Sequence, residues 1–171
     1  MTISLTIVGL GYVGLPLAQE ACRSGLAVTG LDTDSSVVAG LMSSVSHIDD
    51  IDSTGVAEML AAGFNATTDS ACISDSDVII ICVPTPLDDD GTPDLSAVKA
   101  ATRTVSEHLQ PGSLVVLEST TYPGTTEDTV RPLLESGSGL TAGVDFNLAY
   151  SPERIDPGNP EWGLRNTPKI V

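Results

Sequence analysis

The chain opens with Ile3-Ser4-Leu5-Thr6-Ile7-Val8-Gly9-Leu10-Gly11-Tyr12-Val13-Gly14, an apolar run that leads directly into a Gly-x-Gly-x-x-Gly motif. Where a strand turns into a helix, Gly9 permits the tight turn, Gly11 lets a pyrophosphate approach the backbone, and Gly14 lets the helix pack on the strand. The pyrophosphate then lies at a helix N-terminus, which favours negative charge. The motif therefore predicts a dinucleotide site, although glycine clusters also form plain turns.

Asp32 follows the glycines at the spacing that this motif requires. A helix expected over residues 13–24 is followed by a second apolar run, 26–31, which leads to Asp32. An acid about 20 residues after the glycines binds the ribose hydroxyls of the adenosine, and it repels a 2′-phosphate. The alternative is a helix cap, since Asp34 or Ser35 could open the next helix. The order of strand, glycine turn, helix, second strand and acid favours the role of Asp32 in cofactor binding. The negative charge of Asp32 favours NAD over NADP.

Composition limits the classes of protein and partner. A chain of 171 residues can bury a substantial core but is too short for two full domains. We therefore expect residues 1–171 to form one compact domain or a piece of a longer protein. The formal net charge of −16 argues against nucleic acid and anionic membrane surfaces as partners. The charge is explained by solubility or by adaptation to salt.

The sequence shows no membrane or export signal. No apolar run approaches the roughly 20 residues of a membrane span, and the first residues lack the basic start of a signal peptide. We therefore expect a cytoplasmic protein. Cys22, Cys72 and Cys82 are widely spaced, with no metal-binding or redox motif around them, so we expect buried, reduced thiols.

Strands and helices are expected to alternate along the chain. Strand-like runs occupy residues 3–8, 27–31, 64–67, 78–83, 114–117 and 146–150, and helical patterns occupy 56–62, 96–109 and 125–134. This order predicts an α/β fold, a Rossmann-like doubly wound parallel sheet with helices on both faces. Residues 78–83 are continuously apolar, as in a central strand covered on both faces. The acidic stretches 46–52 and 87–91 are expected to be solvent-exposed connections.

Loops with polar side chains that could bind a ligand or take part in catalysis follow three of these strands. In an open parallel sheet, ligands bind outside the carboxyl ends of the strands. The loops at 83–86, 118–125 and 150–158 combine prolines with hydroxyl side chains, and the last contains Glu153. Each loop alone could simply end a strand. All three at one edge favour a ligand site.

These residues together resemble the amino-terminal domain of the UDP-glucose and GDP-mannose dehydrogenase family. The resemblance covers nearly the whole chain. Its parts are residues 9–18, Asp32, 83–88, 118–120 and 151–154. The tract 153–158 looks most like the branch that acts on UDP-N-acetylhexosamines, because UDP-glucose members usually carry a second acid where Pro157 stands.

The resemblance implies an NAD-dependent oxidation of the C6 alcohol of a UDP-sugar to a carboxylate, through two hydride transfers. A cysteine nucleophile would hold the intermediate, and covalent capture keeps a reactive aldehyde from escaping. In the family that cysteine, the central helix and the sugar-binding domain lie beyond the region matched here, and homodimers form through the central helix. The resemblance implies no metal.

Site residues carry over from the family motifs by position. The pyrophosphate would be bound by the motif residues Gly9, Gly11, Tyr12, Val13 and Gly14. The other cofactor contacts would be Asp32 at the ribose, Val83 and Thr85 along the strand edge, and Ser119 and Thr120 near the nicotinamide.

The catalytic residues implied by the resemblance are Thr120 and Glu153. Thr120 would hold the hydrolytic water, and Glu153 would act as the acid–base group, with a pKa raised by desolvation under a bound cofactor. Glu153 and Arg154 would lie at the substrate. The alternative for Glu153 is an ordinary ion pair with Arg154 or Arg165.

Two other functions remain open at this stage. The chain could be a free-standing NAD-binding module without catalysis, which a natural stop after Val171 would favour. It could also belong to another Rossmann oxidoreductase, of the 3-hydroxyacid dehydrogenase type. The loop at 151–154 speaks against the second of these.

Overall fold

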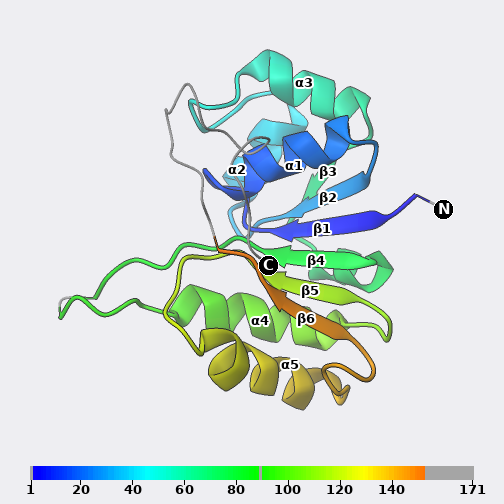
Figure 1. Cartoon of the computed structure of the whole chain (residues 1–171). Helices are drawn as coiled ribbons and strands as arrows, with labels where there is room; N and C mark the ends of the chain where they lie inside the picture. The colour runs from blue at the N-terminus through cyan, green and yellow to red at the C-terminus, as the bar shows by residue number, and fades with distance from the viewer. Residues whose placement is uncertain (1, 89, 153–171) are drawn as a thin grey trace.

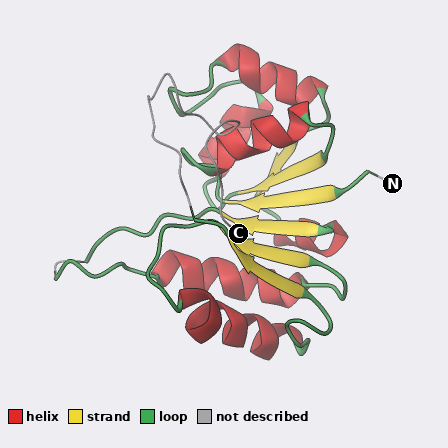
Figure 2. Cartoon of the chain, in the orientation of Figure 1, coloured by secondary structure: helices red, strands yellow, loops and turns green. Residues whose placement is uncertain are grey.

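A computed structural model, which describes residues 2–88 and 90–152, contains the expected parallel sheet (Figures 1 and 2). It has six strands in the order β3-β2-β1-β4-β5-β6, and every neighbouring pair is parallel. The strands are β1 Ser4–Val8, β2 Ala27–Leu31, β3 Asn65–Thr67, β4 Val78–Ile81, β5 Leu114–Leu117 and β6 Asn147–Tyr150. The Rossmann-like fold predicted from the sequence is confirmed.

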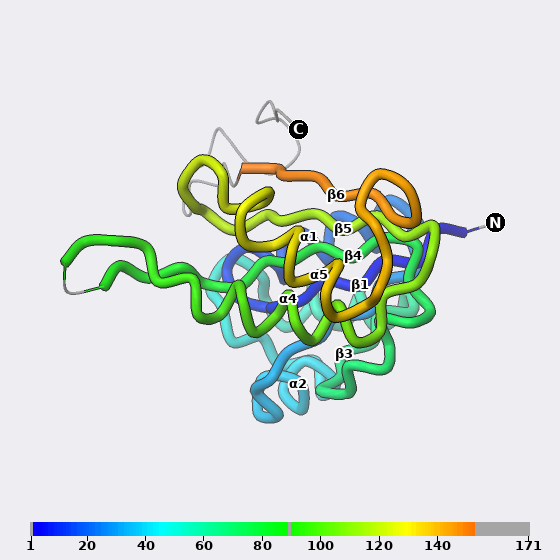
Figure 3. The backbone as a smooth tube through the Cα atoms, turned by 90° about the horizontal axis from the view of Figure 1, so that it is seen from below, coloured from blue at the N-terminus to red at the C-terminus, as the bar shows by residue number. Residues whose placement is uncertain are grey.

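Helices cover both faces of the sheet. The described helices are α1 Gly14–Arg23, α2 Ser35–Met42, α3 Ser53–Ala61, the 3-10 helix η1 Ser70–Asp75, α4 Ser96–His108, the π-helix η2 Thr126–Val130 and α5 Arg131–Ser138. One layer contains α1, α2 and α3, and the opposite layer contains α4 and α5 (Figures 1 and 3). The expected helix at 125–134 is therefore a π-helical turn that continues into α5.

Each face of the sheet has its own apolar core. On one face Ile7, Leu15 and Val56 are completely buried, and on the other face Ile79, Ile81 and Val115 are completely buried. Alternation of side chains along the strands separates the two sets.

The central strand β4 is fully covered on only one face. Ile79 and Ile81 have no exposed area, but Val78 and Ile80 are only half-buried. The reason is the position of the helices, because α1 packs on β1 and β2 while α2 packs on β3. The predicted coverage of both faces is therefore complete on the side of Ile79 and Ile81 and partial on the side of Val78 and Ile80, which pack against the other core.

The turn between β1 and α1 requires glycine at two positions. Gly9 has φ = +95°, and a Cβ there would come within 2.6 Å of the Cys82 carbonyl oxygen. A Cβ on Gly14 would collide with the Gly9 carbonyl oxygen. Strand, turn and helix are therefore in backbone contact, as the motif predicts.

The acidic connection at 46–52 is not simply solvent-exposed. Ile48 and Ile51 are 5% and 3% exposed and belong to the core beneath α1. Asp52 is the N-cap of α3, where its carboxylate accepts a hydrogen bond from the Gly55 N–H at 2.7 Å. The prediction of a purely solvated loop was wrong, because the two isoleucines anchor it.

The second acidic connection is exposed, as expected, and it has regular structure. Leu87 and Pro93 form an antiparallel bridge, and the Asp94 N–H donates to the Pro86 carbonyl oxygen at 2.7 Å. This hairpin projects from the carboxyl edge of the sheet (Figure 1), and Leu87 at its side is 70% exposed.

The backbone contact at Gly14 predicts a sharp difference between two glycine variants. Gly14→Ala should lower the free energy of unfolding by about 1–3 kcal/mol, because the new methyl group meets backbone that cannot move aside. Gly11→Ala is the matched control, since a Cβ there has nothing within 4 Å, and its effect should stay within about 0.5 kcal/mol. Denaturant unfolding measures both. Equal stability of the two variants would contradict the packing described here.

Candidate functional site

Two adjoining cavities lie at the carboxyl edge of the sheet. They have volumes of about 480 and 590 Å³ and share five lining residues. The shared residues are Gly9, Asp32, Thr33, Val83 and Pro84. Together the cavities form one groove that crosses the sheet where the β1 and β4 crossovers leave in opposite directions, which is the ordinary ligand site of a doubly wound fold.

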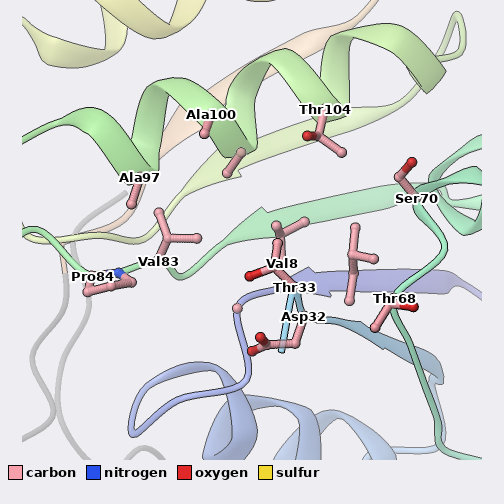
Figure 4. Close-up of a pocket in the computed structure, with 13 residues that line it drawn as sticks. Val8, Asp32, Thr33, Thr68, Ser70, Val83, Pro84, Ala97, Ala100 and Thr104 are labelled. Atoms are coloured by element: carbon pink, nitrogen blue, oxygen red, sulfur yellow. The ribbon is translucent and has the colours of Figure 1, made fainter. Parts of the chain in front are cut away.

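The first cavity is lined mainly by apolar side chains and lies between β1 and α4. Figure 4 shows Ala97, Ala100 and Thr104 facing it from α4, with Asp32 and Thr33 on the opposite side. Small side chains at these helical spacings leave a slot between helix and sheet. Sequence reasoning missed this wall, although the Ala-x-x-Ala-Ala-x-x-Thr pattern at 97–104 was the available signal.

The glycine turn lines the second cavity and fits a phosphate ligand. Gly11 lines this cavity, and the position of its missing Cβ is open space. In the described part of the chain, α2 and α3 have the carboxylates of Asp34 and Asp52 at their N-termini, whereas the N-cap residue of α1, Val13, makes no side-chain cap hydrogen bond. The N-terminus of α1 can therefore receive an anion from outside the chain.

Asp32 lies at the junction of the two cavities. Its carboxylate accepts hydrogen bonds from the Leu10 N–H at 2.8 Å and from the Asp34 N–H at 2.9 Å. It therefore connects the end of β2 to the glycine turn. The N-cap of α2 is Asp34, whose carboxylate accepts from the Ser36 N–H at 2.8 Å. The alternative that Asp32 is only a helix cap was wrong.

The ends of β4 and β5 are joined by side-chain hydroxyls. The buried Ser119 hydroxyl donates to the Val83 carbonyl oxygen at 2.8 Å, and the Thr85 hydroxyl donates to the Thr120 carbonyl oxygen at 2.6 Å. Both hydroxyls therefore hold the two loops together on the wall of the second cavity. The Thr120 side chain is exposed there.

The structure brings most of the predicted site residues together. Those that line the groove are Gly9, Gly11, Tyr12, Val13, Asp32, Val83, Thr85, Ser119 and Thr120. Gly14 lies behind them, against the Gly9 carbonyl oxygen. Glu153 and Arg154 lie outside the described residues, so their roles stay predictions. The binding roles of the other residues also stay predictions.

Two further side chains of the groove were missed by sequence reasoning. His47 lines the second cavity from the loop between α2 and α3, and Glu118 lines it from the end of β5. Glu118 is only 3% exposed. The sequence signal for His47 was a single basic residue, followed by Ile48, inside an otherwise acidic stretch.

The cysteines lack the character of reactive thiols. Cys22 and Cys82 are buried and Cys72 is half-buried. Burial raises the pKa of the Cys22 thiol to about 11 and also raises the pKa of Cys72. A thiol with a raised pKa is protonated at neutral pH and reacts poorly. Cys22 and Cys72 therefore act as packing groups.

The described residues offer neither a metal-binding cluster nor a membrane-spanning helix. In residues 2–88 and 90–152, no three His, Cys, Asp or Glu side chains gather in a way that could hold a metal ion. None of the helices described here has the length and apolar character needed to cross a membrane.

Sequence comparison identifies relatives of the whole chain. The UDP-glucose/GDP-mannose dehydrogenase family, NAD binding domain, matches residues 3–171. The UDP-N-acetyl-D-mannosamine dehydrogenase of Pyrococcus horikoshii is 46% identical over 157 residues, which are 90% of this chain and 37% of that protein. The UDP-N-acetyl-D-glucosamine 6-dehydrogenase of Pseudomonas aeruginosa is 36% identical, over 99% of this chain and 39% of that protein.

Solved structures agree with these matches. The structure of the P. horikoshii enzyme has a TM-score of 0.85 at 44% identity and covers 91% of this chain and 37% of that one. A ternary complex of GDP-mannose dehydrogenase from P. aeruginosa has a TM-score of 0.81 at 32% identity, covering 89% of this chain and 36% of that one. The chain thus spans about two fifths of the length of the relatives it matches.

The position of Asp32 predicts discrimination between NAD and NADP. The chain should bind NAD at least about tenfold more tightly than NADP, because the fixed carboxylate repels a 2′-phosphate. Asp32→Asn removes the charge at constant size and should bring the ratio of the two dissociation constants toward one. The same change disturbs one of the two backbone hydrogen bonds, so the melting temperature should also fall.

Calorimetric titration with both cofactors gives this ratio. The ratio is its own control, since the two ligands differ only in the phosphate. Equal affinities in the wild-type chain would show that Asp32 does not face the ribose.

Proposed function

The chain belongs to the UDP-glucose/GDP-mannose dehydrogenase family, and on that premise we propose that the full-length protein oxidises the C6 alcohol of a UDP-N-acetylhexosamine to a carboxylate. The substrate would be UDP-N-acetylglucosamine or UDP-N-acetylmannosamine. The present chain supplies the NAD-binding domain. The central helix, the cysteine nucleophile and the sugar-binding domain would follow it, consistent with its coverage of the relatives.

The observation that carries this proposal is the groove itself. The two adjoining cavities connect the fixed carboxylate of Asp32, the open position at Gly11 and the ends of β4 and β5. A dinucleotide needs these parts in that order, from adenosine through pyrophosphate to nicotinamide. NAD, when bound, supplies the hydride acceptor.

The residues of this chain would bind and orient the reactants. The pyrophosphate would lie on the N-terminus of α1, and Asp32 would accept hydrogen bonds from the ribose hydroxyls. The loops fixed by the hydroxyls of Ser119 and Thr85 would form the wall beside the nicotinamide. The exposed Thr120 hydroxyl would hold the water that cleaves the covalent intermediate, with Glu153 as its base.

Two observations favour a UDP-N-acetylhexosamine as substrate. The tract 153–158 lacks the second acid usual in UDP-glucose members, and relatives acting on UDP-N-acetylmannosamine and UDP-N-acetylglucosamine are 46% and 36% identical. Arg154 would contact this substrate together with Glu153. The second candidate is a free-standing NAD-binding module. The family match over residues 3–171 speaks against a 3-hydroxyacid dehydrogenase.

The proposed setting is the cytoplasm, with a homodimer of the full-length protein. The three cysteines support a reducing compartment, since Cys22, Cys72 and Cys82 are all thiols, and secreted proteins more often pair their cysteines. The dimer would form through the central helix that follows this domain.

The isolated 171-residue chain should not oxidise any nucleotide sugar. It lacks the nucleophile and the sugar pocket of the proposed enzyme, so NADH formation from UDP-N-acetylglucosamine or UDP-N-acetylmannosamine should stay at background. Absorbance at the NADH band measures this. The control is Cys82→Ser, which should behave identically. A burst of NADH that disappears in Cys82→Ser would contradict the prediction and make Cys82 the nucleophile.

Glu153→Gln in the full-length protein tests the proposed activity. The variant keeps the size of the side chain and loses the base, so hydrolysis of the thioester should slow more than hydride transfer. NADH should then appear in a burst followed by a slow steady state, and intact-protein mass spectrometry should show the covalent adduct. Wild-type turnover, or loss of NAD binding without an adduct, would make Glu153 a structural residue.

A further inference from the structure

The groove is rich in acids and poor in bases. Its described lining contains the carboxylates of Asp32, Asp34 and Glu118, and His47 is the only basic side chain among the same residues. The whole chain carries only 7 Lys and Arg against 23 acids. A pyrophosphate entering this groove brings further negative charge. Among the described lining residues, backbone N–H groups and His47 are the groups that can compensate this charge.

The two helices that border this part of the groove differ in what they offer an anion. At α2, the Asp34 carboxylate already accepts from the Ser36 N–H and hydroxyl, at 2.8 and 2.6 Å. The α2 residue that lines the cavity, Val37, is apolar. The open N-terminus of α1 is therefore one source of positive potential, and the loop after α2 supplies the other.

That loop holds His47 in a defined place. Ile48 directly after it is buried in the core beneath α1, and Ile51 is buried with it. The Ser46 hydroxyl donates to the Ile48 carbonyl oxygen at 2.9 Å and accepts from the Ile48 N–H at 3.3 Å. Since Ile48 points into the core, its neighbour His47 points outward, where it lines the cavity beside the glycine turn.

The pKa of Asp34 indicates that the imidazole of His47 lies near its carboxylate. The pKa of Asp34 lies below its ordinary value, chiefly because the Ser36 hydroxyl and N–H donate to its carboxylate, and the charge of His47 contributes in the same direction. His47 therefore lies within electrostatic reach of the acidic rim of the groove. It lines the same cavity as the glycine turn, Asp34 and Val37.

We propose that His47 is a cofactor-binding residue that contacts the phosphates of the dinucleotide and offsets the acidic lining of the groove. This inference rests on the proposed function, because it takes NAD as the ligand. Imidazole can donate a hydrogen bond to a phosphate oxygen and, when protonated, also supplies a positive charge. A rigid loop lets it do so with little loss of conformational entropy.

Calorimetric titration of the 171-residue chain with NAD, ADP and adenosine tests this role. His47→Gln should weaken NAD and ADP by about three- to tenfold, the order expected for one partly exposed charged contact. Adenosine has no phosphate, and its affinity should not change. His47→Arg should stay within about twofold of the wild type, since a hydrogen-bond donor for the phosphate is retained. The matched control is Arg23→Gln, which removes one charge at the far end of α1 and should leave all three affinities unchanged.

Ionic strength provides a second measurement. Raising the salt concentration should narrow the difference between wild type and His47→Gln for NAD, because salt screens a charged contact at an open cavity. Unchanged NAD affinity in His47→Gln would overturn this inference alone. An equal loss for adenosine and NAD would also overturn it, by placing the imidazole on the nucleoside. A wild-type chain that binds no NAD would refute the proposed function, and this inference with it.

Discussion

The contact between the Gly9 carbonyl oxygen and the Cα of Gly14 is the constraint on which the site depends. It leaves no room for a Cβ at Gly14, so the first turn of α1 lies directly on the turn that leaves β1. Gly9 is pressed in the same way against the Cys82 carbonyl oxygen at the end of β4. The backbone groups that border the groove are therefore fixed by main-chain packing that leaves no room for an added methyl group.

The order of the sheet then determines where the other site residues lie. Because β1 has β2 on one side and β4 on the other, the acid at the end of β2 and the loop after β4 both reach the glycine turn. The Leu10 N–H bonds to Asp32 on one side, and the loops after β4 and β5 are joined by Ser119 and Thr85 on the other. Residues far apart in sequence thus meet at one edge.

The sequence predicts those parts of the fold that depend on local pattern. The strands Ala27–Leu31 and Leu114–Leu117 match the expected bounds, because short apolar runs bounded by turn residues are typical of strands. The glycine turn was predicted because the motif dictates backbone geometry, and the groove residues after β4 and β5 were predicted from the family resemblance. The run at 78–83 did not show how far helices cover the face of β4 that carries Val78 and Ile80. That coverage depends on which strands the helices pack against.

The groove itself was only partly predictable, for the same reason. Ala97, Ala100 and Thr104 line a cavity only because α4 crosses the sheet beside β1, and no local pattern states that crossing. His47 was hidden inside an acidic stretch whose two isoleucines resemble ordinary loop residues until the core beneath α1 is known. Side chains that reach a site only through tertiary packing are the ones that a single sequence does not reveal.

The two hydrogen bonds of Asp32 have a consequence for the evolution of this domain. The carboxylate that would select the cofactor also ties the end of β2 to the turn after β1, so selectivity and folding share one side chain. A lineage that changed its cofactor from NAD to NADP would have to replace Asp32 and also stabilise the turn after β1 by other contacts. Such a change needs compensating substitutions elsewhere, so cofactor preference in this domain should diverge more slowly than its surface.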